Sequence, residues 1–269
     1  MKNKVVRISI IVVLIGVFAF SAFQIGMYYY SRYQSKKLQQ ELIQQAVVVQ
    51  KPKPDPEPDV PDVPDVPDVP DYPEDIPPEG QVPISVDFET LIKMNRDIIG
   101  WIYLDGTNLN YPIVQAKDND YYLRRGFDKI WSWPGTPFAD YRHEGDFTDF
   151  QTTVYGHNMT DGTMFTPIIE YKKQSFYDEN PVMWLLTPDE VYKVELIAGL
   201  KTDDAGVARL STVGLENADE FLSEIRKEFT FKSKVPATSE DRFLILSTCD
   251  YRQENGRFAV VGKLTLIEE

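Results

Sequence analysis

The fold is decided by two apolar runs, Phe243-Leu-Ile-Leu-Ser-Thr-Cys249 and Arg257-Phe-Ala-Val-Val-Gly-Lys263. The seven residues between them are mostly polar and end in Gly256. Two such runs joined by a short polar connection that contains glycine predict neighbouring antiparallel strands. Cys249, at the end of the first strand, would then lie beside Arg257, at the start of the second. The pattern therefore predicts a thiol and a guanidinium at one end of a sheet.

A base for this thiol has few candidates, because the chain has one cysteine and two histidines. His157 follows the strand-like run Thr153-Val-Tyr-Gly156, where that run breaks into a polar turn. A cysteine with a suitable histidine elsewhere in the chain is the pattern of a thiol nucleophile. The residue types alone fit equally well a small buried cysteine and a structural loop histidine, so both interpretations stay open at this point.

The other histidine, His143, lies among acidic residues in Asp140-Tyr-Arg-His-Glu-Gly-Asp146. This composition superficially suggests a metal site. No second histidine stands near it, so the segment predicts a solvated loop and no bound metal.

The motifs around Cys249 and His157 resemble those of the sortases, and class B is the nearest match. The resemblance is carried by Leu246-Ser-Thr-Cys249, by the arginine eight positions further on, and by Val154-Tyr-Gly-His-Asn-Met159. It also covers three upstream segments: Asn95-Arg-Asp-Ile-Ile-Gly-Trp-Ile102, Tyr111-Pro-Ile-Val-Gln115 and Asp118-Asn-Asp-Tyr-Tyr-Leu123. The family motif Thr-Leu-x-Thr-Cys begins here with Ile245, a change expected to affect packing rather than chemistry.

This resemblance implies that Cys249 attacks a peptide carbonyl, that His157 transfers protons and that Arg257 binds the substrate backbone or the developing oxyanion. It implies no metal and no other cofactor. Five further positions match residues that line the family's substrate groove: Asn119, Leu123, Tyr155, Ser247 and Asp250. Each of the five also has an ordinary interpretation as a turn, core, strand or solvated residue.

Three classes of function are compatible with these residues. The first is a transpeptidase that cleaves a C-terminal sorting motif of surface proteins and transfers them to a peptidoglycan amine. The second is a cysteine protease or peptidoglycan hydrolase that uses water instead, and the third is a non-catalytic binding domain. An arginine paired with the cysteine strand favours the first class. The net charge of −14 argues against a nucleic-acid partner.

A membrane anchor is predicted within residues 1–50. No charged residue occurs from Ile8 to Ser31, and nearly every position up to Met27 is apolar. About 20 such residues span a bilayer, and the tyrosines that follow are typical of a membrane interface. A cleaved signal peptide is the alternative, but the apolar run continues past the weak cleavage site at residues 19–21. A juxtamembrane helix is expected from residue 34.

The basic residues do not decide the orientation of this span. Three precede it and three follow it, so the positive-inside count is a tie. The sortase resemblance implies a catalytic domain outside the cell, in a single-pass protein of the cell membrane.

Residues 51–84 are predicted to form an acidic spacer. Residues 51–80 contain eleven prolines, ten acidic residues and two lysines, and Pro-Asp-Val recurs through them. Proline at every third position prevents helix and sheet and favours an extended polyproline II arm that the repeated charges stiffen. A disordered tether is the alternative.

Residues 85–269 are predicted to form the sortase catalytic domain, a mostly β fold. Short strands are expected at 101–103, 111–115, 151–155, 182–186 and 191–200, with a turn at 203–206. Asp87 can cap an N-terminal helix, and Asn217 a second helix before the cysteine strand. Many short strands with few helices suggest a closed β-barrel.

Overall fold

A computed structural model describes residues 2–50, 82–227, 229–251 and 254–267, and it confirms a mostly β protein with a closed barrel. The elements, in chain order, are α1 Lys2–Ala46, β1 Val47–Val49, β2 Ile84–Val86, α2 Phe88–Met94, β3 Ile98–Tyr103, β4 Asn110–Gln115, η1 Tyr121–Arg124, β5 Phe138–Ala139, β6 Gln151–Tyr155, η2 Thr166–Lys172, α3 Gln174–Glu179, β7 Val182–Leu186, β8 Val191–Asp203, α4 Asp204–Glu216, α5 Ala218–Ile225, β9 Arg242–Cys249 and β10 Gly256–Leu266.

The barrel strands follow the order β10-β8-β7-β3-β4-β5-β6-β9, and the ladder between β9 and β10 closes the ring. β4 pairs with β5 and β6 with β9 in parallel, whereas the other pairs are antiparallel. β9 therefore lies between β6, which precedes His157, and β10, which carries Arg257. All three candidate catalytic residues meet around this strand.

The sequence of β9 is apolar at successive positions because both faces of this strand are buried. Leu244 and Leu246 point into the barrel core, while Phe243 and Ile245 pack on the outside against Phe221 of α5 and its neighbours. Side chains alternate between the two faces of a strand, so a strand covered on both faces needs apolar residues at successive positions.

The two predicted helix caps are confirmed. Asp87 accepts a hydrogen bond from the Thr90 amide at 3.0 Å at the start of α2, and Asn217 accepts one from the Glu220 amide at 3.1 Å at the start of α5. The turn expected at 203–206 is wrong, because α4 begins there. The Asp203 carboxylate accepts from the Gly206 amide at 2.7 Å. Such a bond serves a turn and a first helical turn equally well.

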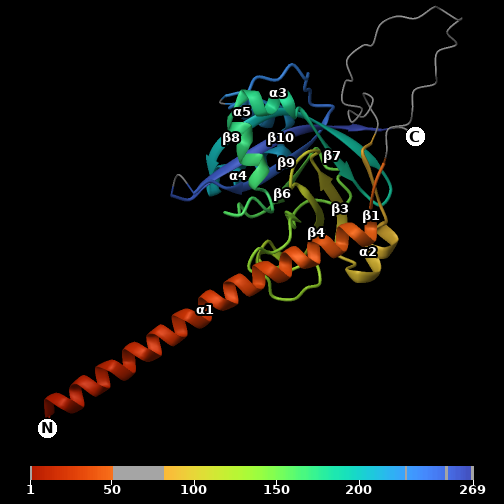
Figure 1. Cartoon of the computed structure of the whole chain (residues 1–269). Helices are drawn as coiled ribbons and strands as arrows, with labels where there is room; N and C mark the ends of the chain where they lie inside the picture. Colours follow the sequence, from red (N-terminus) through yellow and green to blue (C-terminus); the bar gives the residue numbers. More distant parts are fainter. Residues whose placement is uncertain (1, 51–81, 228, 252–253, 268–269) are drawn as a thin grey trace, which may run out of the picture.

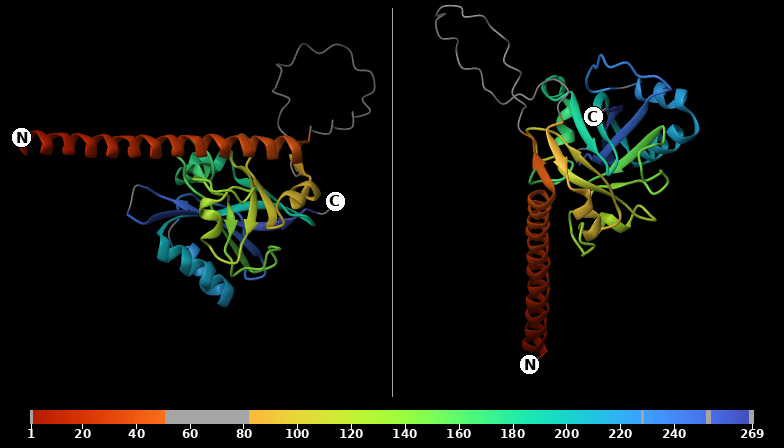
Figure 2. Two further views of the ribbon diagram at one scale, coloured as in Figure 1. Left: turned by 90° about the horizontal axis from the view of Figure 1, so that it is seen from below. Right: turned by 90° about the vertical axis from the view of Figure 1, so that its right-hand side faces the viewer.

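The C-terminal part of α1 packs against the barrel domain, whereas its N-terminal half extends away from it (Figures 1 and 2). Leu42 and Ala46 are almost completely buried in a cluster that includes Ile84 and Leu91. β1 then pairs with β2, and the Gln50 amide donates to the Pro83 carbonyl at 2.9 Å.

The predicted spacer lies mostly at residues 51–81, outside the described residues. The residues on its two sides adjoin each other in the β1–β2 pair, so the barrel is attached to α1 by direct packing as well as through this segment. The predicted boundary between the spacer and the catalytic domain, after residue 84, stays a prediction. Residues of α1 and α2, on its two sides, belong to one apolar cluster.

Candidate active site

The cysteine and the arginine occupy opposite positions in one antiparallel ladder. Cys249 ends β9, and its partner across the β9–β10 pair is Arg257, the register that the sequence predicts. Opposed residues in such a pair project from the same face of the sheet. Residues 243–248 of β9 are buried, but Cys249 is partly exposed. The thiol is therefore accessible at the end of a rigid strand.

The histidine is brought to this strand end by the parallel pairing of β6 and β9. The register sets Tyr155 opposite Ser247, and the Gly156 amide extends the pairing by donating to the Ser247 carbonyl at 3.0 Å. A Cβ atom at Gly156 would come within 2.5 Å of the Phe165 ring, so only glycine allows this close passage. His157 follows immediately, at the point where the chain leaves the barrel.

Two side chains brace the histidine loop against the cysteine strand. The Thr248 hydroxyl donates to the Gly156 carbonyl at 2.7 Å, and the Asn158 amide donates to the Cys249 carbonyl at 3.0 Å. These bonds act on the residues immediately before and after His157. They restrict the backbone of the histidine relative to the backbone of the cysteine.

The His157 ring is held on its other side by the end of η1. Its Nε2 atom lies 3.1 Å from the Leu123 carbonyl, which can only accept, so Nε2 carries the proton and Nδ1 is the basic atom in the neutral ring. The Arg124 guanidinium lies 3.4 Å from the same Nε2 atom. Burial lowers the pKa of His157, the bond to Leu123 opposes this, and the positive charges of Arg124 and Arg257 lower it further. The site therefore favours the neutral imidazole.

Arg257 is oriented by a residue of α4. Its Nη2 atom lies 2.6 Å from the Asp204 carboxylate, and its Nη1 atom donates to the Gly256 carbonyl at 3.3 Å. Asp204 is more than half exposed, so the ion pair contributes little to stability, up to about 1 kcal/mol. Its effect is to direct a planar fork of donors along the edge of the site.

A cleft of about 300 Å³ joins these groups, a size within the range of small ligand sites. It is lined by His157, Cys249 and Arg257 and by four of the five predicted groove residues: Asn119, Leu123, Tyr155 and Ser247. Its other lining residues are Asp120, Tyr122, Thr136, Phe138, Gly156, Asp204, Val207, Ala208 and Thr248. The structure thus brings together seven of the eight residues singled out from the sequence.

Asp250 is the one predicted site residue that does not line this cleft. Its carboxylate lies 2.5 Å from the Lys172 ammonium of η2, and both side chains are nearly buried. Its backbone amide donates to the Gly256 carbonyl, closing the β9–β10 turn. A substrate contact of Asp250 stays a prediction, and the described contacts fit a residue that fixes the turn.

Tyr251 is a neighbour of the thiol that sequence reasoning missed. Burial of the phenol, together with the charge of Cys249 and a hydrogen bond to it, raises the pKa of Tyr251. The thiol therefore has a hydrogen-bonding neighbour just beyond the end of β9.

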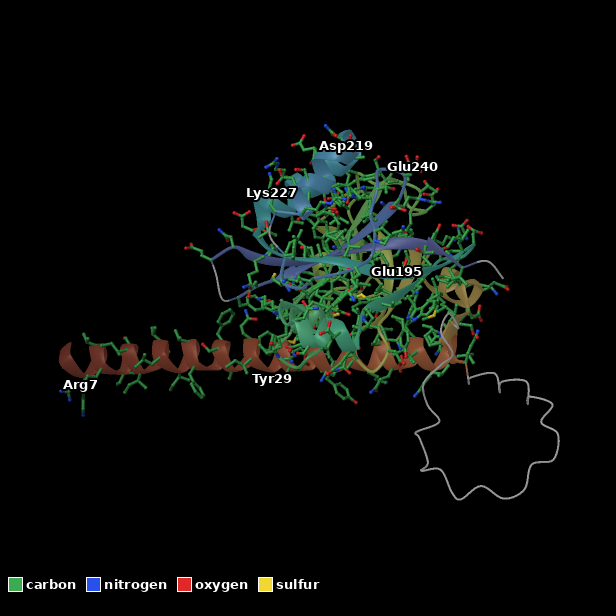
Figure 3. The ribbon with its side chains drawn as sticks, turned by 90° about the horizontal axis from the view of Figure 1, so that it is seen from above. Arg7, Tyr29, Glu195, Asp219, Lys227 and Glu240 are labelled. Carbon is green, nitrogen blue, oxygen red and sulfur yellow. The ribbon has the colours of Figure 1, made fainter. Side chains whose placement is uncertain are left out.

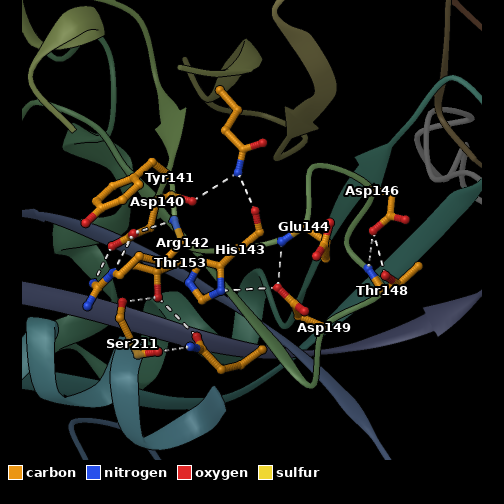
Figure 4. A network of polar contacts seen from close by, with 12 residues as sticks. Asp140, Tyr141, Arg142, His143, Glu144, Asp146, Thr148, Asp149, Thr153 and Ser211 are labelled. Atoms are coloured by element: carbon orange, nitrogen blue, oxygen red, sulfur yellow. Dashed lines mark hydrogen bonds and ion pairs between the residues drawn. The ribbon is translucent and has the colours of Figure 1, made fainter. Parts of the chain in front are cut away.

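The loop that carries Asp140 holds two of the predicted groove residues, Tyr155 and Asn119. Figure 4 shows the contacts of Asp140 with Arg142 in this loop. Arg142 binds the Asp140 carboxylate with two bonds of 2.8 and 2.6 Å, and the Tyr155 hydroxyl donates to it at 2.9 Å. Burial alone would raise the pKa of Asp140, but these bonds outweigh it and lower the pKa to about 2. Asn119 accepts from the Tyr141 amide at 3.1 Å. Both groove side chains are thus held by one loop.

The same loop corrects the expectation for His143. This histidine is 5% exposed, so the prediction of a solvated position is wrong. The Gln115 amide donates to the Asp140 and His143 carbonyls at 3.0 and 2.8 Å and holds the loop against the barrel. Burial lowers the pKa of His143, although Asp149 lies 3.4 Å from its ring (Figure 4).

Known proteins resemble about two thirds of the chain. The chain is 34% identical over 182 residues to sortase B of Listeria monocytogenes, covering 66% of this chain and 74% of that one. The sortase B–substrate complex of Staphylococcus aureus superposes with a TM-score of 0.63 at 34% identity, over 67% and 85% of the two chains. Sortase B of Clostridium perfringens superposes with a TM-score of 0.63 at 31% identity, over 66% of this chain and 100% of that one. Sortase B is also known in complex with triglycine. No family model matches the chain.

Proposed function

The chain belongs to the class B sortases, which are cysteine transpeptidases, and we propose that it joins surface proteins to a cell-wall amine through a thioacyl intermediate on Cys249. The observation that carries this assignment is the opposition of Cys249 and Arg257 across β9 and β10, with His157 in the same cleft. A nucleophile, a base and an oxyanion donor that share one site are the groups that acyl transfer needs.

In the first half of the reaction, the Cys249 thiol gives its proton to the neutral His157 ring as its sulfur attacks the carbonyl carbon of the substrate. A C–S bond forms, and the C–N bond breaks. His157 then returns the proton to the departing amine. The lowered pKa of His157 supports this order, because it keeps the free ring available as a base.

In the second half, an incoming primary amine attacks the thioester carbon. His157 takes a proton from this amine, a C–N bond forms as the C–S bond breaks, and His157 returns the proton to the sulfur of Cys249. Arg257, oriented by Asp204, donates hydrogen bonds to the oxygen that becomes negative in both halves. The substrate is a surface protein that carries a C-terminal sorting motif.

The acceptor is proposed to be a peptidoglycan amine on a glycine-type branch. A sortase B relative is known in complex with triglycine, and a small unhindered amine suits a cleft of this size. The runner-up is hydrolysis with water as acceptor, as in a cysteine protease or a peptidoglycan hydrolase.

The long helix α1 is proposed to anchor the enzyme in the membrane of a Gram-positive cell. It contains a window with a mean hydropathy of 2.5, none of which is buried against the protein. Arg32 and Lys36 lie 2.5 and 3.1 Å from Asp161 of the barrel, so these charges serve the contact between helix and barrel. The exposed Lys4 and Arg7 before the span then favour a cytoplasmic N-terminus and an extracellular barrel.

Incubation with a sorting-peptide library, with and without triglycine, tests the proposed function. The proposal predicts a cleaved fragment joined to triglycine, and Cys249→Ala should form no product. Cleavage that yields only the free acid in the presence of triglycine would favour the hydrolase. Activity retained by Cys249→Ala would overturn both assignments.

A further inference from the structure

A short loop between η1 and β5 exposes three large apolar side chains close together. In this tryptophan loop (residues 128–133), Ile130 is 66%, Trp131 52% and Trp133 39% exposed. The two indole rings have centroids 6.4 Å apart. Outside α1, the described chain has no other three large exposed apolar residues within four successive positions. Clustered apolar exposure of this kind marks an interaction surface.

The loop is rigid enough to present these side chains. The Gly126 amide donates to the Ile130 carbonyl at 2.8 Å, and the Ser132 amide donates to the Arg124 carbonyl at 2.9 Å. Lys129 adopts a left-handed backbone with φ of 65° at the tip, and its ammonium lies 2.9 Å from Asp97. The exposed positions are therefore set by backbone bonds and an ion pair.

The loop is joined to α1 just beyond the proposed membrane span. The Trp133 amide donates to the Ser31 hydroxyl at 2.8 Å, and the Trp133 ring packs edge-on against Tyr28 at 5.4 Å. Ser31 is four residues beyond Met27, the last residue of the apolar run. At 1.5 Å per residue, this places the contact about 6 Å beyond the end of that run.

This distance corresponds to the polar layer of a bilayer. A hydrocarbon core of about 30 Å inside a total of about 40–45 Å leaves roughly 5–7 Å of headgroup region on each side. Tyr29, Tyr30 and Tyr33 belong to the same stretch of α1, and all three are exposed. Figure 3 shows Tyr29 near the edge of the barrel and Arg7 close to the free end of the helix.

We propose that the tryptophan loop is a second membrane contact, whose Trp131, Trp133 and Ile130 side chains insert into the lipid headgroup interface. The inference rests on the proposed anchoring by α1. Indole and phenol rings prefer this interface because one edge is apolar and the other forms hydrogen bonds. Two contacts, the helix and the loop, fix the orientation of the barrel above the membrane, which a single helix leaves free to tilt.

The contact also lies close to the catalytic base. The Arg124 guanidinium stacks over the Trp133 ring at 4.5 Å and donates to the Trp133 carbonyl at 2.5 Å. The same group lies 3.4 Å from Nε2 of His157. The contact of the tryptophan loop with the lipid therefore holds the histidine end of the cleft near the membrane surface.

Quenching of tryptophan fluorescence tests this contact with the full chain in phosphatidylcholine–phosphatidylglycerol vesicles. Bromine on the lipid acyl chains near the headgroup should quench the emission of the unaltered chain. Trp101 and Trp184 are buried in the protein, so the double variant Trp131→Phe, Trp133→Phe should lose most of this quenching. Equal quenching in the chain and the double variant, or none in either, overturns the proposal.

A matched control moves the exposed indole away from the membrane. Phe229 is 50% exposed and lines a pocket together with Ile225 and Arg226 at the end of α5. Figure 3 shows Asp219 of α5 and the nearby Lys227 far from α1. Phe229→Trp in the double variant should restore emission without restoring quenching. Flotation with the vesicles separates the two proposals. A chain that does not float refutes the anchor and the loop contact together, whereas a chain that floats without quenching refutes the loop contact alone.

Discussion

The cysteine and the histidine of this sortase are held in two different ways. Cys249 is part of a continuous ladder with β10, which also carries Arg257. His157 lies beyond the end of β6 and is held by contacts with Leu123, with the β9 strand through its neighbours, and with Arg124. The proposed nucleophile and the proposed oxyanion donor therefore belong to one hairpin, whereas the proposed base depends on segments that are distant in the chain. Changes to the hairpin should remove chemistry, and changes around the histidine should adjust it.

Among changes that leave Cys249 and His157 in place, the largest effect is expected from Arg257→Lys. The variant keeps the positive charge but loses the planar fork of donors, and the loss of one oxyanion donor costs about 10²–10³-fold in rate. Peptide transfer by the purified enzyme gives kcat/KM. Arg242→Lys, at the other end of β9, is the matched control and should keep normal activity. Near-normal turnover in Arg257→Lys would mean that only the charge matters, and the directed role of Arg257 would be refuted.

A smaller effect is expected from Asn158→Ala, which removes the bond between the histidine loop and the Cys249 carbonyl. A single hydrogen bond contributes about 0.5–1.5 kcal/mol, so kcat should fall by up to about tenfold. Alkylation of Cys249 by iodoacetamide should still occur, because the hairpin is intact. The control is Asn108→Ala, whose amide donates to the Gly162 carbonyl of the same loop. If both variants lose the same activity, the bond to Cys249 has no special role.

The smallest effect is expected from Arg124→Met, as a shift in pH dependence. Arg124 is one of two positive charges that lower the pKa of His157, so its removal raises this pKa. A neutral His157 is needed in the free enzyme, and activity is lost as the pH falls through its pKa. The acidic limb of kcat/KM should therefore move to higher pH, and the NMR titration of the ring should move with it.

Arg125→Met is the control for this shift. Arg125 directly follows Arg124 in the chain, and its guanidinium stacks over the Tyr121 ring at 4.2 Å. It is not among the groups that shift the pKa of His157. Its variant should keep the acidic limb of the parent enzyme. An unchanged limb in Arg124→Met as well would refute the contribution of the Arg124 charge to the pKa of His157.

Local patterns in the sequence predicted much of this structure. The pairing of Cys249 with Arg257 follows from two apolar runs and a short turn, and the helix caps at Asp87 and Asn217 depend on a few neighbouring residues. The many short strands indicated a closed barrel, and the family resemblance supplied the groove residues. These predictions rest on segments whose structure is decided by nearby residues or by a motif.

Two of the features missed from the sequence differ in cause, one because a local signal is ambiguous and one because it depends on a distant contact. Asp204 begins a helix that was predicted as a turn, because Asp203 satisfies the amide of Gly206 in either conformation. His143 is buried because Gln115 closes its loop, and no local pattern signals that bond. Contacts of this kind need the folded chain.

The most direct test of the account is the intact mass of the enzyme during turnover. Rapid quenching after mixing with a cleavable sorting peptide should give an adduct equal to the N-terminal part of that peptide, bound to Cys249. Addition of triglycine should discharge it into a peptide product, and Cys249→Ala should form no adduct. An enzyme that cleaves the peptide without any such adduct, or that carries the adduct on another residue, would contradict the central claim.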